Sequence, residues 1–434
     1  MKVLDSEKKI GITTFLNPSK GLGGKLRFQP EDFGVTEKSL YPSEKKDGKF
    51  SIAEITSTYW ETNLLIRELS NRLHISRQRI GFAGTKDKRA KTTQLMSFYK
   101  VKTDDLSNVK IKDVEIKNIY SSDRPVKIGT LLGNKFEITI RKIKPDTKPD
   151  DIKSVWSIID ENGGFPNFFG IQRFGIIRPI THIVGKHIIN GDFEKAVMSY
   201  IANPIKGEDE YSFKLRKELE ETRNYSEALK DYPNNLNFEK AILNKLVQDP
   251  TDFVSALKEL PKNLLTMFVY AYQSYLFNKI ICERIKRRIP LNQAVLGDIV
   301  LPVKNGVIEE REIPVLDRNI DKVNLQLSKQ KAVVSGILFG SDSVFCDGEM
   351  GEIEHKIIEA EKINHRDFII PEIPFISSSG SRRPILGFVK DFDYKLFDDE
   401  TTGKALTLNF ELLKGCYATS FLREFMKADD IRNY

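Results

Sequence analysis

The pattern of apolar residues changes twice along this 434-residue chain, and that change is the strongest constraint on its fold. Up to about residue 165, alternating runs such as Phe33–Glu37 and Phe136–Ile140 are interleaved with helical patterns. Residues 179–290 are mostly helical, and strand patterns return near the C-terminus. The strict strand–helix alternation of a doubly wound parallel sheet is missing. We therefore expect an α+β fold in which one domain interrupts another.

The patterns also predict individual elements. Thr62 is expected to cap the helix that follows it, and Gly163-Gly164 to end another. We expect loop structure in the first 25 residues and short strands over 295–346. Strands are predicted at 33–37, 50–58, 91–99, 136–140, 384–389 and 405–410, and helices at 62–73, 152–159, 263–288, 349–364 and from Thr419 onward.

Composition narrows the class of protein. The chain is 40% hydrophobic, which excludes a disordered chain, and it has no run near the roughly 20 apolar residues of a membrane helix. The N-terminus turns polar too early for a secretory signal. Three cysteines and five histidines show neither CxxC nor HExxH spacing. We expect a soluble, cytoplasmic protein without a membrane segment or a metal site.

Charge is concentrated in one short segment. The net charge is 68 − 61 = +7, and residues 76–91 hold six basic side chains and one acidic one, Asp87, a local net charge of +5. Such a cluster favours phosphate binding. A carboxylate among cations stays ionised, and can attack an electrophilic carbon or stabilise a cationic one. A solvated basic turn, in which Asp87 only relieves repulsion, fits the pattern equally well.

Four further clusters have two interpretations each. Residues 166–175 contain three aromatic rings and Arg173, which could stack bases and bind phosphate or pack as an interdomain turn. Asn134 could read a base edge, with Phe136 stacking or in the core. Tyr417 could stack or pack. The basic end of the long helix, with Arg284, could touch phosphate or complement the helix C-terminus.

Together these segments resemble the TruD family of tRNA pseudouridine synthases, in order along most of the chain. The segment between about residues 190 and 262 has no match in the compact bacterial members of the family. Such extra length resembles the archaeal and eukaryotic branch. The matching segments are Pro30–Glu37 (family pattern PEDFxVxE), Phe82–Ala90 (AGxKDxxA), Leu132–Phe136 (LxGNxF), Pro166–Gly175 (PNYFGxQRFG, with Phe168 in place of Tyr) and Tyr417–Glu424 (FATSxxRE, with Tyr417 in place of Phe).

The resemblance implies isomerisation of uridine to pseudouridine in tRNA, at uridine 13 of the D arm. Because nothing is oxidised and nothing leaves in this reaction, we expect no cofactor or metal. We also expect a monomer, although the sequence does not fix the oligomeric state. Other RNAs are conceivable substrates. The resemblance also implies Asp87 as the essential carboxylate with Arg27 beside it, base stacking by Phe33 and Tyr417, and support from Asn134 and Phe136. From charge, the expected RNA-binding set also includes Lys86, Lys88, Arg89 and Arg173.

The implied fold is the pseudouridine-synthase catalytic domain, a mixed and largely antiparallel sheet with helices. It is expected to be interrupted by a mostly helical α/β insertion domain. The catalytic domain would occupy residues 1–166 and 383–434, and the insertion domain 167–382, with the extra segment at about 190–262.

Two other functions remain open from the residues alone. A uracil-directed RNA glycosylase could use the same aspartate and would release free uracil. A non-catalytic RNA-binding protein would need only the basic cluster. A methyltransferase is disfavoured, because no glycine-rich loop is followed by an acidic partner for a ribose.

Overall fold

The computed structural model describes residues 3–434, which divide into two units. Unit 2 comprises Asn17–Phe165, Asn305–Val307 and Gly387–Tyr434. Unit 1 comprises the N-terminal segment up to Leu16, Pro166–Lys304 and Ile308–Leu386. The chain leaves unit 2 at β8 (Phe165–Pro166) and returns to it at β14 (Leu386–Gly387). One unit is thus inserted into the sequence of the other.

The N-terminal segment groups with unit 1, although the sequence placed it with residues 17–166. Ile10 and Ile12 are buried, and the Ile10 carbonyl accepts a hydrogen bond of 2.9 Å from the Asn278 amide. The backbone N–H of Thr13 lies 3.2 Å from Cys282 Sγ. These contacts attach the segment to the long helix of unit 1. The segment was predicted as loop and contains a short helix, α1 (Asp5–Lys9).

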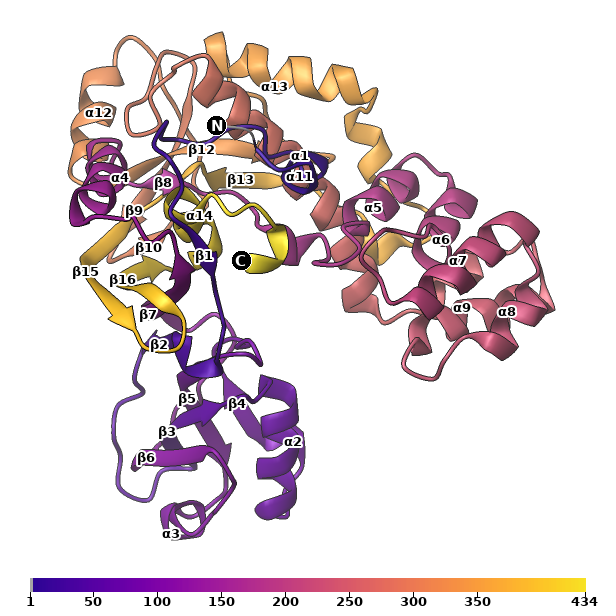
Figure 1. Ribbon diagram of the computed structural model, residues 1–434, viewed down its shortest axis with the longest axis horizontal. Coiled ribbons are helices and arrows are strands. Elements are labelled where there is room, and N and C mark those ends of the chain that lie inside the picture. Colours follow the sequence, from indigo (N-terminus) through magenta and orange to yellow (C-terminus); the bar gives the residue numbers. More distant parts are fainter. Residues whose placement is uncertain (1–2) are drawn as a thin grey trace. The chain divides into compact units, whose positions relative to one another are not determined.

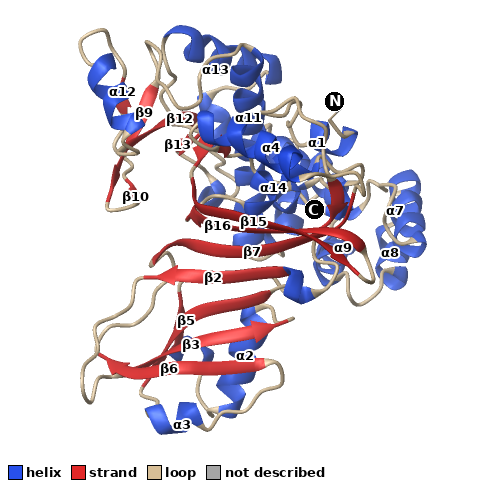
Figure 2. Cartoon of the chain, turned by 60° about the vertical axis from the view of Figure 1, so that its left-hand side comes forward, coloured by secondary structure: helices blue, strands red, loops and turns tan. Residues whose placement is uncertain are grey.

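Unit 2 is built on a nine-stranded sheet whose main path runs β15-β16-β7-β2-β5-β3-β6 (Figure 2). β1 adds to β7 and β4 adds to β5. The β2–β5 pair is parallel and the other pairs are antiparallel, so the α+β class and the mixed, largely antiparallel sheet are confirmed. The strands are β1 (Gly23–Lys25), β2 (Phe33–Ser39), β3 (Phe50–Thr58), β4 (Ile80–Phe82), β5 (Lys91–Tyr99), β6 (Val114–Ser122), β7 (Leu131–Ile143), β15 (Val389–Asp399) and β16 (Gly403–Leu413).

Helices cover one face of this sheet at two separate places. Residues opposite each other on neighbouring strands point to the same face, so Phe410, Phe136, Val35 and Thr92 form one continuous row. At the β16 end of the row, α14 (Ala418–Met426) packs through Phe421, whose ring lies 4.6 Å from that of Phe410. Helix α4 (Pro149–Glu161) packs on the neighbouring strand β15.

At the other end of the row, α2 (Thr62–Arg72) covers β3 and β5 (Figure 1). Its buried Leu65 and Leu69 share a core with Ile55 and Met96. Met96 is four residues beyond Thr92 on β5 and therefore lies on the same face. A short helix, α3 (Thr103–Ser107), follows β5. The middle of the face, over β2 and β7, thus lies between α2 and α14.

Unit 1 is mostly helical. Helices α5, α10 and α13 pack on α11, whereas α6, α7, α8 and α9 pack on one another and on α5 and α10. The close approach of α5 to α11 requires Gly185: a Cβ there would lie 2.0 Å from the Phe268 carbonyl oxygen. A small sheet of β9, β11, β12 and β13, with β10 at the edge of β9, completes the unit. The elements are α5 (Thr181–Ile189), α6 (Phe193–Ile201), α7 (Glu210–Thr222), α8 (Tyr225–Asp231), α9 (Asn237–Gln248), α10 (Phe253–Lys258), α11 (Lys262–Lys286), β9 (Ile299–Lys304), β10 (Val307–Ile308), β11 (Ile313–Pro314), α12 (Ile320–Ser328), β12 (Ala332–Leu338), α13 (Gly348–Glu361) and β13 (Ser381–Pro384).

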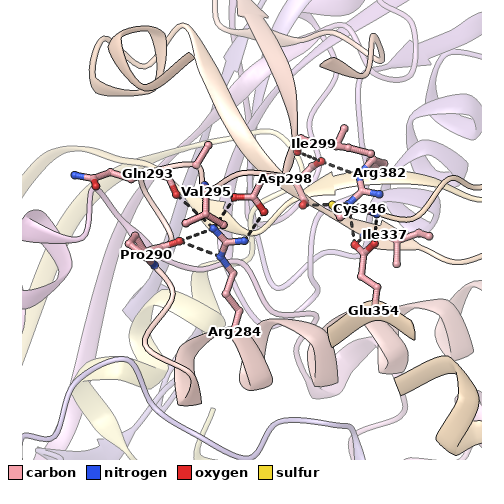
Figure 3. A network of polar contacts seen from close by, with 12 residues as sticks. Arg284, Pro290, Gln293, Val295, Asp298, Ile299, Ile337, Cys346, Glu354 and Arg382 are labelled. Atoms are coloured by element: carbon pink, nitrogen blue, oxygen red, sulfur yellow. Dashed lines mark hydrogen bonds and ion pairs between the residues drawn. The ribbon is translucent and has the colours of Figure 1, made fainter. Parts of the chain in front are cut away.

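Two buried arginines in unit 1 are fully enclosed by acceptors (Figure 3). Arg284 donates to both carboxylate oxygens of Asp298, at 2.7 and 2.9 Å, and to the Pro290 carbonyl, and neither charged side chain is exposed. Arg382 donates to Oε1 of Glu354 at 2.8 Å and to the Val344 carbonyl at 2.8 Å, and the Arg382 and Glu354 side chains are 1% and 0% exposed. Of the two interpretations of Arg284, contact with phosphate is excluded, since its guanidinium is enclosed inside the unit.

The hydropathy of the helices agrees with the expectation from the sequence. Among residues 3–434, no helix is long and apolar enough to cross a membrane. The long helix was predicted to within two residues of α11, whereas the helix α12 within the predicted run of short strands was missed.

Candidate active site

Three of the six cations of the basic cluster, Lys86, Lys88 and Arg89, lie with Asp87 in the loop that joins β4 to β5. Two hydrogen bonds attach this loop to the segment between β3 and α2. The Lys86 N–H donates to Thr62 Oγ1 at 2.7 Å, and the Tyr59 N–H donates to the Ala90 carbonyl at 3.1 Å. Between these attachments the Asp87 side chain is 55% exposed. The loop therefore presents its carboxylate to solvent from a fixed base.

Arg27 holds the carboxylate of Asp87. Its Nη2 lies 2.9 Å from Asp87 Oδ2, and its guanidinium lies over the Phe33 ring, 4.0 Å from the centroid. Arg27 has a left-handed backbone (φ 53°), and its carbonyl accepts a hydrogen bond of 3.0 Å from Arg89. Burial lowers the pKa of Arg27 and the neighbouring Asp87 carboxylate raises it again, but a guanidinium stays charged at neutral pH. Arg27 thus fixes the position of Asp87 without covering it.

Three aromatic rings lie in the same part of the sheet face. The Phe33 and Phe136 rings meet edge to face at 6.5 Å, and Phe136 stacks on Phe410 at 5.1 Å. Phe33 and Phe136 are 4% and 6% exposed, so both also serve as core residues. Through Arg27, this aromatic row continues to Asp87.

Asn134 lies two residues before Phe136 on β7 and shares its face. Its Oδ1 atom is buried and has no hydrogen-bond partner among residues 3–434. Buried polar atoms in folded proteins almost always have a partner, so an orphaned acceptor is a sign of a binding position. Asn134 stands directly opposite Glu37 in the β2–β7 pair.

Lys86 points into the unit. Its Nζ lies 2.7 Å from Glu37 Oε2, and the two side chains are 7% and 0% exposed. Glu37 also accepts a hydrogen bond of 2.7 Å from the Ser39 hydroxyl. The structure thus pairs Lys86 with a buried carboxylate and leaves it little surface for a phosphate. Lys88 and Arg89 are exposed, and Lys88 Nζ lies 5.0 Å from the centroid of the Tyr59 ring.

The remaining predicted residues lie in different places. Tyr417 is half-buried and occupies the N-cap position of α14 in unit 2. Arg173 belongs to unit 1, at the end of a short 3₁₀ turn, where its Nε lies 3.4 Å from Ser274 Oγ and its guanidinium 5.7 Å from the Phe169 centroid. No three His, Cys, Asp or Glu side chains gather as a metal site within 3–434.

Three contributors to this site were missed from the sequence. Glu37 lies on the buried face of its strand together with Phe33. Because a buried carboxylate requires a cation, the alternation of apolar residues in this strand could have predicted a basic partner for Glu37. Thr62 was taken as the helix cap, but the Glu61 side chain caps α2 by accepting the Leu64 N–H at 3.0 Å. The Thr62 hydroxyl is thereby free to hold the loop. Tyr59 gave no signal.

Comparison with known proteins agrees with the resemblance seen in the motifs. Residues 9–425 match the family model described as tRNA pseudouridine synthase D (TruD). A protein of Methanococcoides burtonii named probable tRNA pseudouridine synthase D is 45% identical over 432 residues, 98% of both chains. One of the same name from Methanosarcina acetivorans is 41% identical, over 100% of this chain and 99% of its own.

A solved structure extends the likeness to the fold. The crystal structure of the putative tRNA pseudouridine synthase D from Methanosarcina mazei superposes with a TM-score of 0.90, at 40% identity and full coverage of both chains. The order of the motifs, the mixed sheet and the matches over nearly the whole length lead to one assignment. The chain belongs to the tRNA pseudouridine synthase D (TruD) family.

Proposed function

We propose that this protein is a tRNA pseudouridine synthase that isomerises uridine 13 in the D arm of tRNA, with Asp87 as its catalytic carboxylate. The observation that carries the proposal is the exposed Asp87 carboxylate, held by Arg27 at 2.9 Å on the loop that matches the family pattern. Family membership supports the reaction type. On this proposal unit 2 is the catalytic domain and unit 1 the insertion domain.

The chemistry requires the target base to leave its stack. Extrusion costs a few kcal/mol, which contacts with the pocket must offset. We assign stacking on the extruded base to Phe33 and Tyr417, a hydrogen bond to the base edge to the orphaned Asn134 oxygen, and the pocket wall to Phe136. An acceptor at Asn134 Oδ1 suits an N–H group, and uracil presents one at N3.

In the reaction the N1–C1′ bond breaks, the uracil turns, and a C5–C1′ bond forms. The proton on C5 is lost and N1 takes up a proton, so the RNA keeps its mass and nothing is oxidised or released. This balance calls for no cofactor or metal. Asp87 acts at ribose C1′, at uracil C6, or as a base toward the 2′ position, and in each case it must be ionised and oriented. Arg27 provides that orientation.

The other charged residues divide between binding and positioning. Lys88 and Arg89 are exposed beside Asp87, and we assign them to the phosphates that flank the target. Arg173 is assigned to the RNA backbone from unit 1. Lys86 acts as a positioning residue, because its ion pair with Glu37 and its backbone bond to Thr62 hold the residue next to Asp87 in place.

The test is a carbodiimide primer-extension map of tRNA treated with the wild-type protein, Asp87→Asn or Arg27→Met. We expect a stop at position 13 with the wild type and none with Asp87→Asn. Arg27→Met should slow the reaction by about a hundredfold, since misplacement of a reacting group costs about that much. Salt-dependent tRNA binding should survive in both variants.

Three results would contradict the proposal in different ways. Normal modification by Asp87→Asn would remove Asp87 from the mechanism. A stop at another position would replace uridine 13 as the target. Release of free uracil, measured by chromatography, would indicate the glycosylase alternative.

A further inference from the structure

An exposed aromatic residue next to the site has an unfavourable backbone conformation. Tyr59 follows β3 with φ of 64°, in the left-handed region that bulky residues rarely adopt. Within residues 3–434 it is the one Phe, Tyr or Trp with a positive φ. Its side chain stays 52% exposed, so burial contributes little to offset the strain. Strain of this kind persists where the surrounding structure imposes it, and it concentrates at functional sites.

The surrounding structure fixes Tyr59 against the loop that carries Asp87. Its N–H donates to the Ala90 carbonyl, and three residues later Thr62 accepts the Lys86 N–H. The segment from Tyr59 to Thr62 therefore lies along the loop and is bonded on both sides of Asp87. The next residue, Trp60, donates its indole N–H to the Lys112 carbonyl at 3.1 Å. These bonds hold the backbone of Tyr59 next to the loop that carries Asp87.

A cation accompanies this ring. Lys88, the residue directly after Asp87, places Nζ 5.0 Å from the Tyr59 centroid, within the range of a cation–π interaction. Lys88 is exposed, and more than half of the Tyr59 surface remains accessible beside it. An open aromatic face with an adjacent ammonium group is the combination that holds single-stranded nucleotides, since the base stacks and the phosphate meets the cation.

We propose that Tyr59 and Lys88 form a binding subsite for the nucleotide next to the reacting uridine. This inference rests on the proposed function. Tyr59 stacks on the base of that nucleotide, and Lys88 binds its phosphate. A neighbouring nucleotide is the fitting ligand because extrusion of the uridine exposes the faces of the bases beside it. Lys88 directly follows Asp87 in the loop, so the proposal places the subsite beside the reacting centre.

Binding of an in vitro transcribed tRNA tests the subsite, measured as Kd in an Asp87→Asn background so that the RNA is not altered. Tyr59→Ala should weaken binding by about five- to a hundredfold, the range expected for loss of one stacked base. Tyr59→Phe keeps the ring and should bind within about twofold of the parent. Tyr41→Ala is the matched control, because Tyr41 is 55% exposed but its hydroxyl donates to the carboxylate of Glu54, whereas the ring of Tyr59 lies next to the Lys88 ammonium group.

The melting temperature provides a second readout, and it should rise in a variant whose RNA binding is weaker. Tyr59→Gly removes the ring together with the left-handed strain, so it should raise the melting temperature while it weakens RNA binding. His74→Gly is the control for strain alone, because His74 is exposed with φ of 51° and follows α2 away from the loop contacts. It should raise the melting temperature and leave Kd unchanged.

The outcomes separate this inference from the proposed function. If the wild-type protein forms no pseudouridine, the proposed function fails. If the wild type is active but Tyr59→Ala binds tRNA as tightly as the parent, the subsite alone is overturned. A lower melting temperature for Tyr59→Gly with unchanged Kd would also overturn it, since Tyr59 would then have a structural role only.

Discussion

The two units each contain an arginine–carboxylate pair of nearly the same length in very different surroundings. In unit 1 the Arg284–Asp298 contact is 2.7 Å, and in unit 2 the Arg27–Asp87 contact is 2.9 Å. Both members of the first pair are 0% exposed, whereas Asp87 is 55% exposed. The two pairs therefore do not differ in distance, but the pair that we propose to serve the reaction differs from the buried pair in the exposure of its carboxylate.

The Arg284–Asp298 and Arg27–Asp87 pairs also differ in the number of hydrogen bonds that the carboxylate accepts. Both oxygens of Asp298 accept from Arg284, and Oδ2 also accepts the Val295 N–H at 2.9 Å (Figure 3). Within the described chain, Asp87 accepts one hydrogen bond, from Arg27. A carboxylate with filled acceptor sites cannot engage a substrate, while Asp87 keeps that capacity. Within unit 2, the Lys86–Glu37 pair is buried like the arginine–carboxylate pairs of unit 1. In this respect it differs from the neighbouring Arg27–Asp87 pair.

The contrast between the two arginine–carboxylate pairs can be tested by substitution. The largest expected effect is on the free energy of unfolding. Arg284→Met leaves Asp298 buried without a counter-charge and should lower the free energy of unfolding by about 3–5 kcal/mol. Asp87→Asn should lower it by about 1 kcal/mol or less, because Asp87 is 55% exposed and the asparagine oxygen can still accept the hydrogen bond of the buried Arg27. Urea unfolding of both variants measures the difference.

A double variant is the control for this test. Arg284→Met with Asp298→Leu removes both charges, and replacement of a buried pair by apolar residues is often neutral. It should therefore regain most of the lost stability. Equal destabilisation by Arg284→Met and Asp87→Asn would mean that exposure does not distinguish the two pairs.

Much of the fold could be predicted because local patterns agree with it. The alternation around Phe33, Phe136 and Phe410 matches strands whose apolar residues share one face of the sheet, and the continuous apolar pattern of α11 predicts a long helix. The short elements were missed for a physical reason. Helix α12 buries only Val323 and Leu327, so its helical period is weak, and its formation depends on tertiary contacts.

The site was predictable where residue type alone carries the chemistry. Asp87 stands out as the one acid among six bases. The direction of each cation could not be read from charge, since Lys86 and Lys88 lie two residues apart in one loop and point to different surroundings. That difference depends on Glu37, which is distant in sequence and comes close only through the pairing of β2 with β5 and β7.

A smaller effect is expected from pH in unit 1. Burial raises the pKa of Glu361, but hydrogen bonds from Lys186 and Lys279, each at 2.7 Å, outweigh burial and lower the pKa to about 2. Because the folded pKa lies below the ordinary value, this carboxylate stabilises the protein above about pH 4.5 and loses that contribution as pH falls toward 2.

Glu361→Gln should therefore lower the free energy of unfolding by roughly 1–3 kcal/mol at pH 7. The difference from the wild type should shrink between pH 4.5 and 2. Denaturation curves at several pH values measure it. A difference that stays constant across this range would show that Glu361 contributes packing and not charge.

The smallest effect concerns the two lysines on either side of Asp87. Lys88→Gln should reduce the slope of log Kd against log salt by about one, the expected change for one lost phosphate contact. Lys86→Gln should leave the slope unchanged, because the Lys86 ammonium is 7% exposed and already paired with Glu37. The substitutions are the same and lie in one loop, so a difference in slope reports only where each ammonium points. If both variants reduce the slope by the same amount, Lys86 must turn outward when RNA binds. The Lys86–Glu37 pair would then be part of the binding surface.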